Sequence, residues 1–143
     1  MSTKENKTIE RRWFKAFDKG KAAVMAVTDE LVSDDFIFHS ASGEDIIGLK
    51  AYKKYAGDVF SAFPDVHLTI DDMVAEGDKV AVRFTVTGTH KGKFMGAPPT
   101  NKKIKMWSIQ IDRIAGGKFV EGWERYDTLG FMQQLGLIPK PKK

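Results

Sequence analysis

The spacing of apolar residues changes near Pro64, and this change limits the possible fold more than any other feature of the chain. Before Pro64 the apolar residues recur at helical spacing, as at Leu49, Tyr52 and Ala56. After Pro64 they alternate with polar residues, most regularly over 80–86. Helices followed by antiparallel hairpins indicate an α+β fold in which the helices cover one face of a curved sheet.

The pattern predicts three helices in the first half of the chain. One carries the stripe 9–17 and ends at Gly20, a second covers about 24–31, and a third runs from about Leu49 to Pro64. Expected strands lie at 36–39, 66–75, 80–87, 105–113 and 123–127.

Length and composition indicate one globular domain. The 143 residues fit a single domain over 1–143, with an ordered core of about 7–137 and a basic tail at 138–143. The hydrophobic content is 42% and the chain has no cysteine, which excludes disulfides and a thiol nucleophile. The three histidines lack the spacing of metal ligands, so no metal is expected.

Charge and hydropathy argue against nucleic-acid and membrane partners. The net charge is only +4 and much of it lies at the ends of the chain, while the aromatic residues follow core spacing. No apolar run approaches the roughly 20 residues of a membrane span. The polar start MSTKENKT has no signal-peptide core, so the expected location is cytoplasmic.

The last predicted hairpin contains the most informative carboxylate. Folding it about Gly116-Gly117 predicts the cross-strand pairs Ile109–Trp123, Trp107–Arg125 and Lys105–Asp127. This face is the aromatic and aliphatic one, so we expect it to face inward. A carboxylate at the end of an apolar wall is costly unless it is paired, hydrated or used in chemistry, and Asp127 is therefore the first candidate for a functional group.

The second half of the chain resembles a known family. Segments 60–104 and 109–136 carry, in order, the phrases GTHKG, PPT, GKF, EGW and QQLG. In these phrases the chain resembles the SnoaL-like polyketide cyclases, within the nuclear transport factor 2-like superfamily. The resemblance implies a cone-shaped, curved antiparallel sheet packed against three N-terminal helices, with a pocket at the open end. It also implies a homodimer.

The resemblance implies a reaction as well. The namesake cyclases close a ring by intramolecular aldol condensation without metal or organic cofactor, using an aspartate of the last strand as acid/base. The motif W-x-x-x-D assigns that role to Asp127, and His39 matches a histidine found in many members. The chain departs from the pattern at Gly122, where many relatives carry histidine. The expected substrate-binding residues are Trp123, Trp107, Arg125, Phe60 and Phe14.

Each assignment leaves an alternative open. Asp127 could instead cap the last helix or pair with Lys105 or Arg125, and His39 could be a hydrogen-bonded rim residue. The two tryptophans could belong to the core. The outer sheet face, with the expected dimer surface, is predicted to carry Arg83, Thr85, Thr87, Ser108 and Gln110.

Three functions therefore remain in view. The first is a cofactor-free cyclase or isomerase that acts on a carbonyl-containing hydrophobic small molecule. The second is a related hydrolase or dehydratase. The third is a non-catalytic binder or scaffold dimer, for which Asp127 would be held by the backbone amide of Leu129 or Gly130.

Overall fold

The structure is a computed structural model that describes residues 2–141. The elements along the chain are α1 (Thr3–Ala16), a short 3₁₀ helix η1 (Phe17–Lys19), α2 (Lys21–Leu31), β1 (Val32–His39), β2 (Asp45–Ile47), α3 (Leu49–Ala62), β3 (His67–Glu76), β4 (Lys79–Thr89), β5 (Lys103–Ala115), β6 (Lys118–Tyr126) and α4 (Thr128–Gln134). The end of the predicted basic tail, 142–143, lies outside the described residues. The division into an ordered core and a tail stays a prediction.

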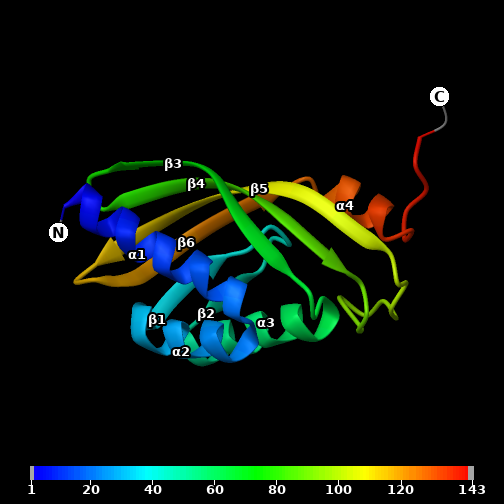
Figure 1. The fold of residues 1–143 in the computed structure, drawn as a ribbon, viewed down its shortest axis with the longest axis horizontal. Coiled ribbons are helices and arrows are strands. Elements are labelled where there is room, and N and C mark those ends of the chain that lie inside the picture. Colours follow the sequence, from blue (N-terminus) through cyan, green and yellow to red (C-terminus); the bar gives the residue numbers. More distant parts are fainter. Residues whose placement is uncertain (1, 142–143) are drawn as a thin grey trace.

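The predicted α+β class is confirmed. The curved sheet arches over α2 and α3, with α1 crossing in front of it and α4 at the far end (Figure 1). Local sequence explains the helix ends. Ser2 and Glu5 form a reciprocal capping box at the start of α1. Gly20 and Gly48 start α2 and α3 at φ of 96° and 94°, and α3 ends just before Pro64.

The sheet is mixed, whereas the sequence predicted an antiparallel one. Its order is β2-β1-β6-β5-β4-β3, and β1 runs parallel to β6. All other neighbouring strands are antiparallel. The parallel pair arises because β1 belongs to the helical half of the chain and enters the sheet beside the last strand. Hairpin patterns cannot reveal such a long-range pairing.

The predicted register of the last hairpin is off by two residues. Ile111, not Ile109, lies opposite Trp123, and Ile109 lies opposite Arg125. One residue of the difference comes from the two-residue turn at Gly116-Gly117, and one comes from a bulge in β6 beside Ile114. Two offsets of one residue add to an even number, so the residues that the alternation grouped on one face still share a face.

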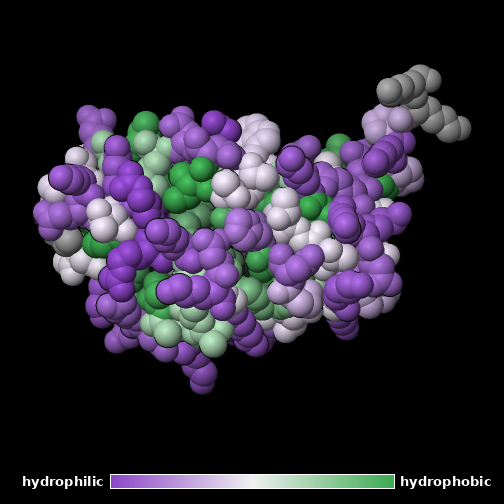
Figure 2. Space-filling view, in the orientation of Figure 1, coloured by the Kyte–Doolittle hydropathy of each residue, from purple (hydrophilic) through white to green (hydrophobic). Residues whose placement is uncertain are grey.

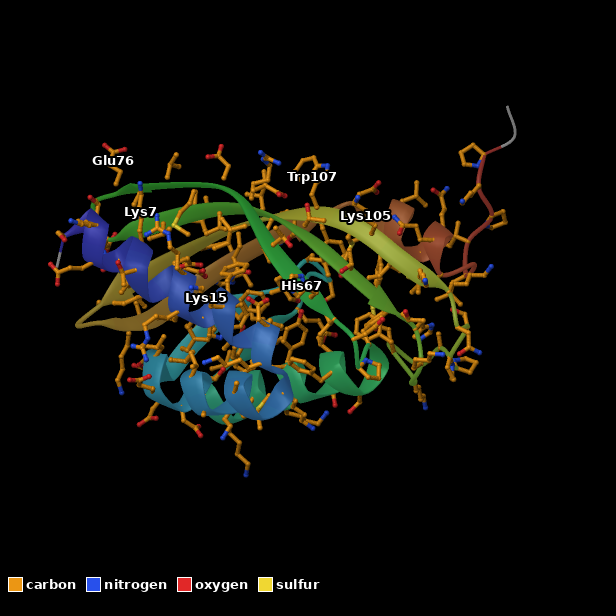
Figure 3. All side chains as sticks on the ribbon, viewed as in Figure 1. Lys7, Lys15, His67, Glu76, Lys105 and Trp107 are labelled. Carbon is orange, nitrogen blue, oxygen red and sulfur yellow. The ribbon has the colours of Figure 1, made fainter. Side chains whose placement is uncertain are left out.

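The faces themselves are reversed relative to the prediction. Trp107 is 59% exposed, and Ile109 and Ile111 are also exposed, whereas Ser108 and Gln110 are buried. Figure 3 shows Trp107 and Lys105 on the side of the sheet that faces away from α2 and α3. The apolar face of the last hairpin is therefore the outer one. Its polar face points inward, where Ser108 and Gln110 line a cavity and Gln110 hydrogen-bonds to the buried carboxylate of Asp112.

Aromatic residues from the helices and the inner sheet face form the core. Trp13 packs edge-on against Phe14 and Phe17, and its Nε1 donates to Thr28 Oγ1 at 3.3 Å, which ties α1 to α2. Phe14 in turn packs edge-on against Phe84 of β4. The face of the molecule shown in Figure 2 is mostly hydrophilic, with small separate hydrophobic areas. Across residues 2–141, none of the helices combines the length and apolar character needed to cross a bilayer.

The loop between β4 and β5 is fastened at its base. His90 N–H donates to Lys102 O, and the N–H groups of Lys91 and Gly92 both donate to Ala62 O. A Cβ at Gly92 would overlap the carbonyl oxygen of Ser61. The close approach of two backbones therefore requires glycine at this position and holds the loop against the end of α3.

We predict that Gly92→Ala lowers the free energy of unfolding by about 1–3 kcal/mol, because rigid backbone has to move. The matched control is Gly57→Ala inside α3, where an added Cβ meets only Lys21 Cε at 3.9 Å. That control should gain about 0.5–1 kcal/mol of stability. Urea unfolding of both variants measures the difference. Equal effects of the same sign would contradict the close backbone contact.

Candidate functional site

A cavity lies between the helices and the inner face of the sheet, and we call it the inner cavity. Its volume is about 100 Å³, and its walls are mostly aromatic and aliphatic. The residues lining it are Trp13, Phe17, Phe38, Tyr52, Tyr55, Ala56, Val59, Phe63, Val66, Leu68, Phe84, Val86, Phe94, Ile104, Met106, Ser108, Gln110, Glu124, Tyr126 and Phe131. Polar groups enter it chiefly from β5, β6 and α3.

A second, more polar space adjoins the inner cavity, and we call it the vestibule. It has a volume of about 610 Å³ and lies between the 40–46 segment, the last two turns of α3 and the 93–96 loop. Both spaces share the side chains of Tyr55, Phe94, Glu124 and Tyr126. These residues therefore mark the junction at which the vestibule and the inner cavity adjoin.

Glu124 is the carboxyl at this junction. It projects from β6 on the inner face, directly across from Gln110 of β5. Its Oε1 atom is buried and has no hydrogen-bond partner among the described residues. Burial, together with the charge of Asp112, raises the pKa of Glu124 to about 7, against the opposing effects of the Ala41 N–H and the Arg125 guanidinium. Glu124 can therefore both accept and donate a proton near neutral pH.

Tyrosine hydroxyls surround this carboxyl. Burial and then the charge of Glu124 raise the pKa of Tyr126 to about 12. Burial, followed by the charges of nearby acidic groups, also raises the pKa values of Tyr52 and Tyr55 well above their usual value. All three phenols therefore stay neutral at physiological pH and keep a proton that can be donated to an oxygen atom in the cavity.

A row of polar side chains crosses the inner face beside Glu124. Ser108 lies opposite Tyr126 and donates from Oγ to the carbonyl oxygen of Arg125 at 3.2 Å. Gln110 Nε2 donates to both carboxylate oxygens of Asp112, at 2.9 and 3.0 Å. The sequence had placed Ser108 and Gln110 on the outer face, and that prediction is wrong.

Asp127, the predicted acid/base residue, caps α4. Its Oδ1 accepts a hydrogen bond from the Gly130 N–H at 2.8 Å. Asp127 lies outside the inner cavity, on a depression of the outer face that it shares with Lys105, Trp107 and other residues. The expectation that this carboxyl enters an interior cavity is therefore wrong. Its catalytic role stays a prediction.

His39, the second predicted catalytic residue, also lies on the outer face. Its ring stacks on Trp123 with centroids 5.4 Å apart. Its Nδ1 is 2.7 Å from Asp45 Oδ1, and its Nε2 is 2.8 Å from Glu121 Oε2. Hydrogen bonds with Glu121 and then Asp45 raise the pKa of His39. His39 and Trp123 thus contact each other, but neither lines the inner cavity.

The other predicted substrate-binding residues divide between the outer face and the core. Trp107 and Arg125 line the same outer depression as Asp127. Phe60 stacks on Phe17 at 5.4 Å, and both Phe60 and Phe14 are buried behind the cavity wall. None of these four described residues lines the inner cavity.

Sequence reasoning missed the polar residues that do line the inner cavity, above all Glu124, Gln110 and Tyr126. A signal for them existed. Ser108, Gln110 and Asp112 alternate as regularly as the apolar residues between them. That regularity is as consistent with a buried polar face that lines a cavity as with a solvent-exposed face. Hydropathy alone favours the second interpretation.

The cavity residues are suited to proton transfer on an apolar molecule. Among residues 2–141, no group of three or more histidine and acidic side chains is arranged to hold a metal ion. The groups available at the junction are one carboxyl of raised pKa, neutral phenols and an amide. Such a set can remove a proton from carbon and donate hydrogen bonds to oxygen.

Known proteins are similar to this chain in sequence and in fold. Nogalonic acid methyl ester cyclase from Streptomyces nogalater is 26% identical over 110 residues, which cover 76% of this chain and 82% of that protein. TsrD from Streptomyces laurentii is 25% identical with a TM-score of 0.83, over 96% of this chain and 99% of that one. A protein from a Jannaschia species, named for the SnoaL-like polyketide cyclases, shares the fold at 22% identity, with a TM-score of 0.86 over 96% and 95% of the two chains.

The family comparison covers nearly the same span as these relatives. A family model described as SnoaL-like polyketide cyclase matches residues 7–135 of this chain. The inner cavity, the vestibule and the whole sheet lie within that span. The chain therefore belongs to the SnoaL-like polyketide cyclase family.

Proposed function

We propose that this protein is a cofactor-free cyclase or isomerase acting on a carbonyl-containing hydrophobic molecule, with Glu124 as its acid/base residue. The observation that carries the proposal is the buried, unpartnered Oε1 of Glu124 at the junction of the inner cavity and the vestibule. Burial of a carboxyl oxygen without a hydrogen-bond partner is costly, and such groups concentrate at functional sites.

The proposed chemistry is an intramolecular aldol addition that closes a ring. The Glu124 carboxylate removes a proton from a carbon flanked by carbonyl groups, and the resulting enolate carbon attacks a second carbonyl carbon of the same molecule. A C–C bond forms, the second carbonyl π bond breaks, and its oxygen takes the proton back from Glu124. No atom is gained or lost. The neutral hydroxyls of Tyr55 and Tyr126 can stabilise the enolate oxygen by hydrogen bonding.

The volumes suggest how a substrate would lie. Sites for small ligands usually measure about 300–1,000 Å³. The inner cavity of about 100 Å³ is too small for a multi-ring molecule, whereas the vestibule of about 610 Å³ is large enough. The substrate would therefore occupy both spaces, with its reacting carbon at Glu124, its apolar end among the aromatic rings and its polar end in the vestibule.

One observation favours a second candidate, a non-catalytic binder. That alternative expected Asp127 to be held by the backbone of α4, and the hydrogen bond from the Gly130 N–H to Asp127 matches it. The two candidates differ at Glu124, since a binder has no need of an ionisable group there. The cytoplasmic location and the lack of a nucleic-acid partner stay predictions.

We also propose that a second copy of the chain covers the outer sheet face. Val74, Ala81, Ile111 and Trp123 lie in register across four strands there. Exposed fractions are 61% for Val74 and 38% for Ile111, and Trp107 adds to the same apolar strip.

Charge complementarity favours a second copy as the occupant of this strip. The neighbouring cross-strand row places Asp72 beside Arg83, with Arg125 further along the row. Two copies related by a two-fold axis could then pair an acidic group of each with a basic group of the other.

The first prediction separates Glu124 from Asp127. Glu124→Gln should lower proton abstraction by about 10²–10⁴-fold, the usual size of an acid/base contribution. Asp127→Asn should leave the rate within a few-fold and change stability little, because asparagine caps a helix about as well as aspartate. The measurement is deuterium exchange at the activated carbon of nogalonic acid methyl ester or an aromatic 1,3-diketone in D₂O. Full activity of Glu124→Gln together with loss in Asp127→Asn would return the role to Asp127.

The second prediction concerns pH. The carboxylate form of Glu124 is the base, so kcat/KM should rise with pH and level off above about 7. Stability should change in the opposite sense. The folded-state pKa lies above the ordinary 4.5, so the stabilisation due to Glu124 is complete below about pH 4.5 and is lost as pH rises through about 7. Glu124→Gln should remove this part of the stability profile, and an unchanged profile would contradict the raised pKa.

The third prediction tests the dimer. Replacing Trp107 and Ile111 together by lysine should convert a species of twice the 16.0 kDa chain mass into a monomer. Sedimentation equilibrium measures the mass. Met95→Lys, which charges an equally exposed residue on the loop, is the control and should leave the mass unchanged. A wild-type mass of 16.0 kDa would remove the proposal.

A further inference from the structure

Two carboxyl groups lie deeper than Glu124, and nothing in the proposed reaction uses them. Glu10 projects from α1 and is 0% exposed, and Asp112 projects from β5 and is 2% exposed. We call these two residues the acid pair. Burying two carboxyl groups in an aromatic core is expensive, so their position needs a physical explanation.

The acid pair can hold only one negative charge. Both oxygens of Glu10 are buried without a donor among the described residues, so Glu10 hydrogen-bonds to Asp112 only as the protonated acid. Burial, and then the charge of Asp112, raises the pKa of Glu10 well above its ordinary value. Burial also raises the pKa of Asp112, but hydrogen bonds from Glu10 and Gln110 oppose that rise. The two hydrogen bonds from Gln110 Nε2 stabilise the carboxylate form of Asp112, so we assign the proton to Glu10.

The anionic member fixes the orientation of a cavity residue. A carboxylate only accepts hydrogen bonds, so the two bonds from Gln110 Nε2 to Asp112 determine which end of the Gln110 amide faces Asp112. The carbonyl oxygen of Gln110 is left on the opposite side, and Gln110 lines the inner cavity across the strand from Glu124. A substrate hydroxyl or enol could donate to that oxygen.

Gly122 makes room for the acid pair. It lies directly opposite Asp112, and a Cβ at Gly122 would come within 2.5 Å of Asp112 Oδ1. Any side chain at this position would displace the Asp112 carboxylate. The position of the Asp112 carboxylate therefore depends on the absence of a side chain at Gly122, because the carboxylate fills the space that a Cβ there would take.

We propose that Glu10 and Asp112 share one proton and act as a single buried anion that orients Gln110 and sets the charge state of Glu124. Glu10 is in this scheme a positioning residue, because its proton keeps Asp112 anionic. The consequence for turnover rests on the proposed function, whereas the acid pair itself does not.

Several other groups also face Glu124 and have to be held constant in a test. They are the hydroxyls of Tyr52, Tyr55 and Tyr126, the Arg125 guanidinium and the Ala41 N–H. Asp112 is the acidic group that raises the pKa of Glu124, after burial. Variants within the acid pair leave all of these other groups in place.

The test is a carboxyl ¹³C NMR titration of the full chain labelled at Glu and Asp side chains. Wild-type Glu10 should stay protonated well above pH 4.5, as expected for a strongly raised pKa. In Asp112→Asn the titration midpoint of Glu124 should fall by about 1 pH unit, the size expected for loss of a charge several ångströms away. Glu10→Gln keeps a donor for Asp112 and should leave the Glu124 midpoint unchanged.

Glu10→Met removes the donor without adding a charge. Asp112 should then take up the proton itself, and the Glu124 midpoint should fall as in Asp112→Asn. If Glu10→Met fails to fold, Asp112→Asn and Glu10→Gln still test the proposal. A Glu124 midpoint unmoved by Asp112→Asn, a shift in Glu10→Gln equal to that in Asp112→Asn, or a Glu10 that titrates near 4.5 would each overturn the proposal.

The titration needs no substrate, so its outcome is independent of the proposed reaction. Activity measurements add a second readout. Asp112→Asn should shift the pH midpoint of kcat/KM by the same amount as the NMR midpoint, which a packing defect alone would not do. If Glu124→Gln keeps full activity while the NMR shifts appear, the proposed function fails and the acid pair stands.

Discussion

The inward-facing polar side of β5 is the constraint on which the rest of the structure depends. Ser108, Gln110 and Asp112 face a core that is otherwise aromatic, and each needs a partner because an unpaired buried polar group costs free energy. Their partners come from three places in the chain: the backbone of β6, the neighbouring side chain on β5, and Glu10 on α1. Helix α1, the curved sheet and the cavity are thereby tied to one another.

Much of the fold could be predicted because the relevant signals are local. The helical stripes, the stop at Gly20 and the end of α3 before Pro64 agree with the structure. The parallel pairing of β1 with β6 could not be predicted from patterning, since it joins segments far apart in the sequence. One residue of the error in the last hairpin came from the two-residue turn, and the other came from a bulge in β6 that leaves no clear mark in the sequence.

The candidate site was predicted poorly for an instructive reason. Alternation correctly grouped Trp107, Ile109 and Asp127 on one face, but hydropathy assigned that face to the interior. Functional cavities depart from the rule that apolar faces point inward, since their function requires buried polar groups. One clue was available in α1, where Glu10 falls on the same stripe as Ile9 and Trp13. A charged residue inside an apolar stripe predicts a buried partner, and here that partner is Asp112.

The parallel pairing of β1 with β6 also has a consequence for biosynthesis. Residues 32–39 leave the ribosome well before their sheet neighbour at 118–126 has been made. Until then one edge of β1 has no strand beside it, and the wall that carries Glu124 does not exist. Contacts between distant segments slow folding, and unpaired edges favour aggregation. The inner cavity can therefore be completed only after β6 has been released, and truncation anywhere before β6 would leave a partly folded, aggregation-prone fragment.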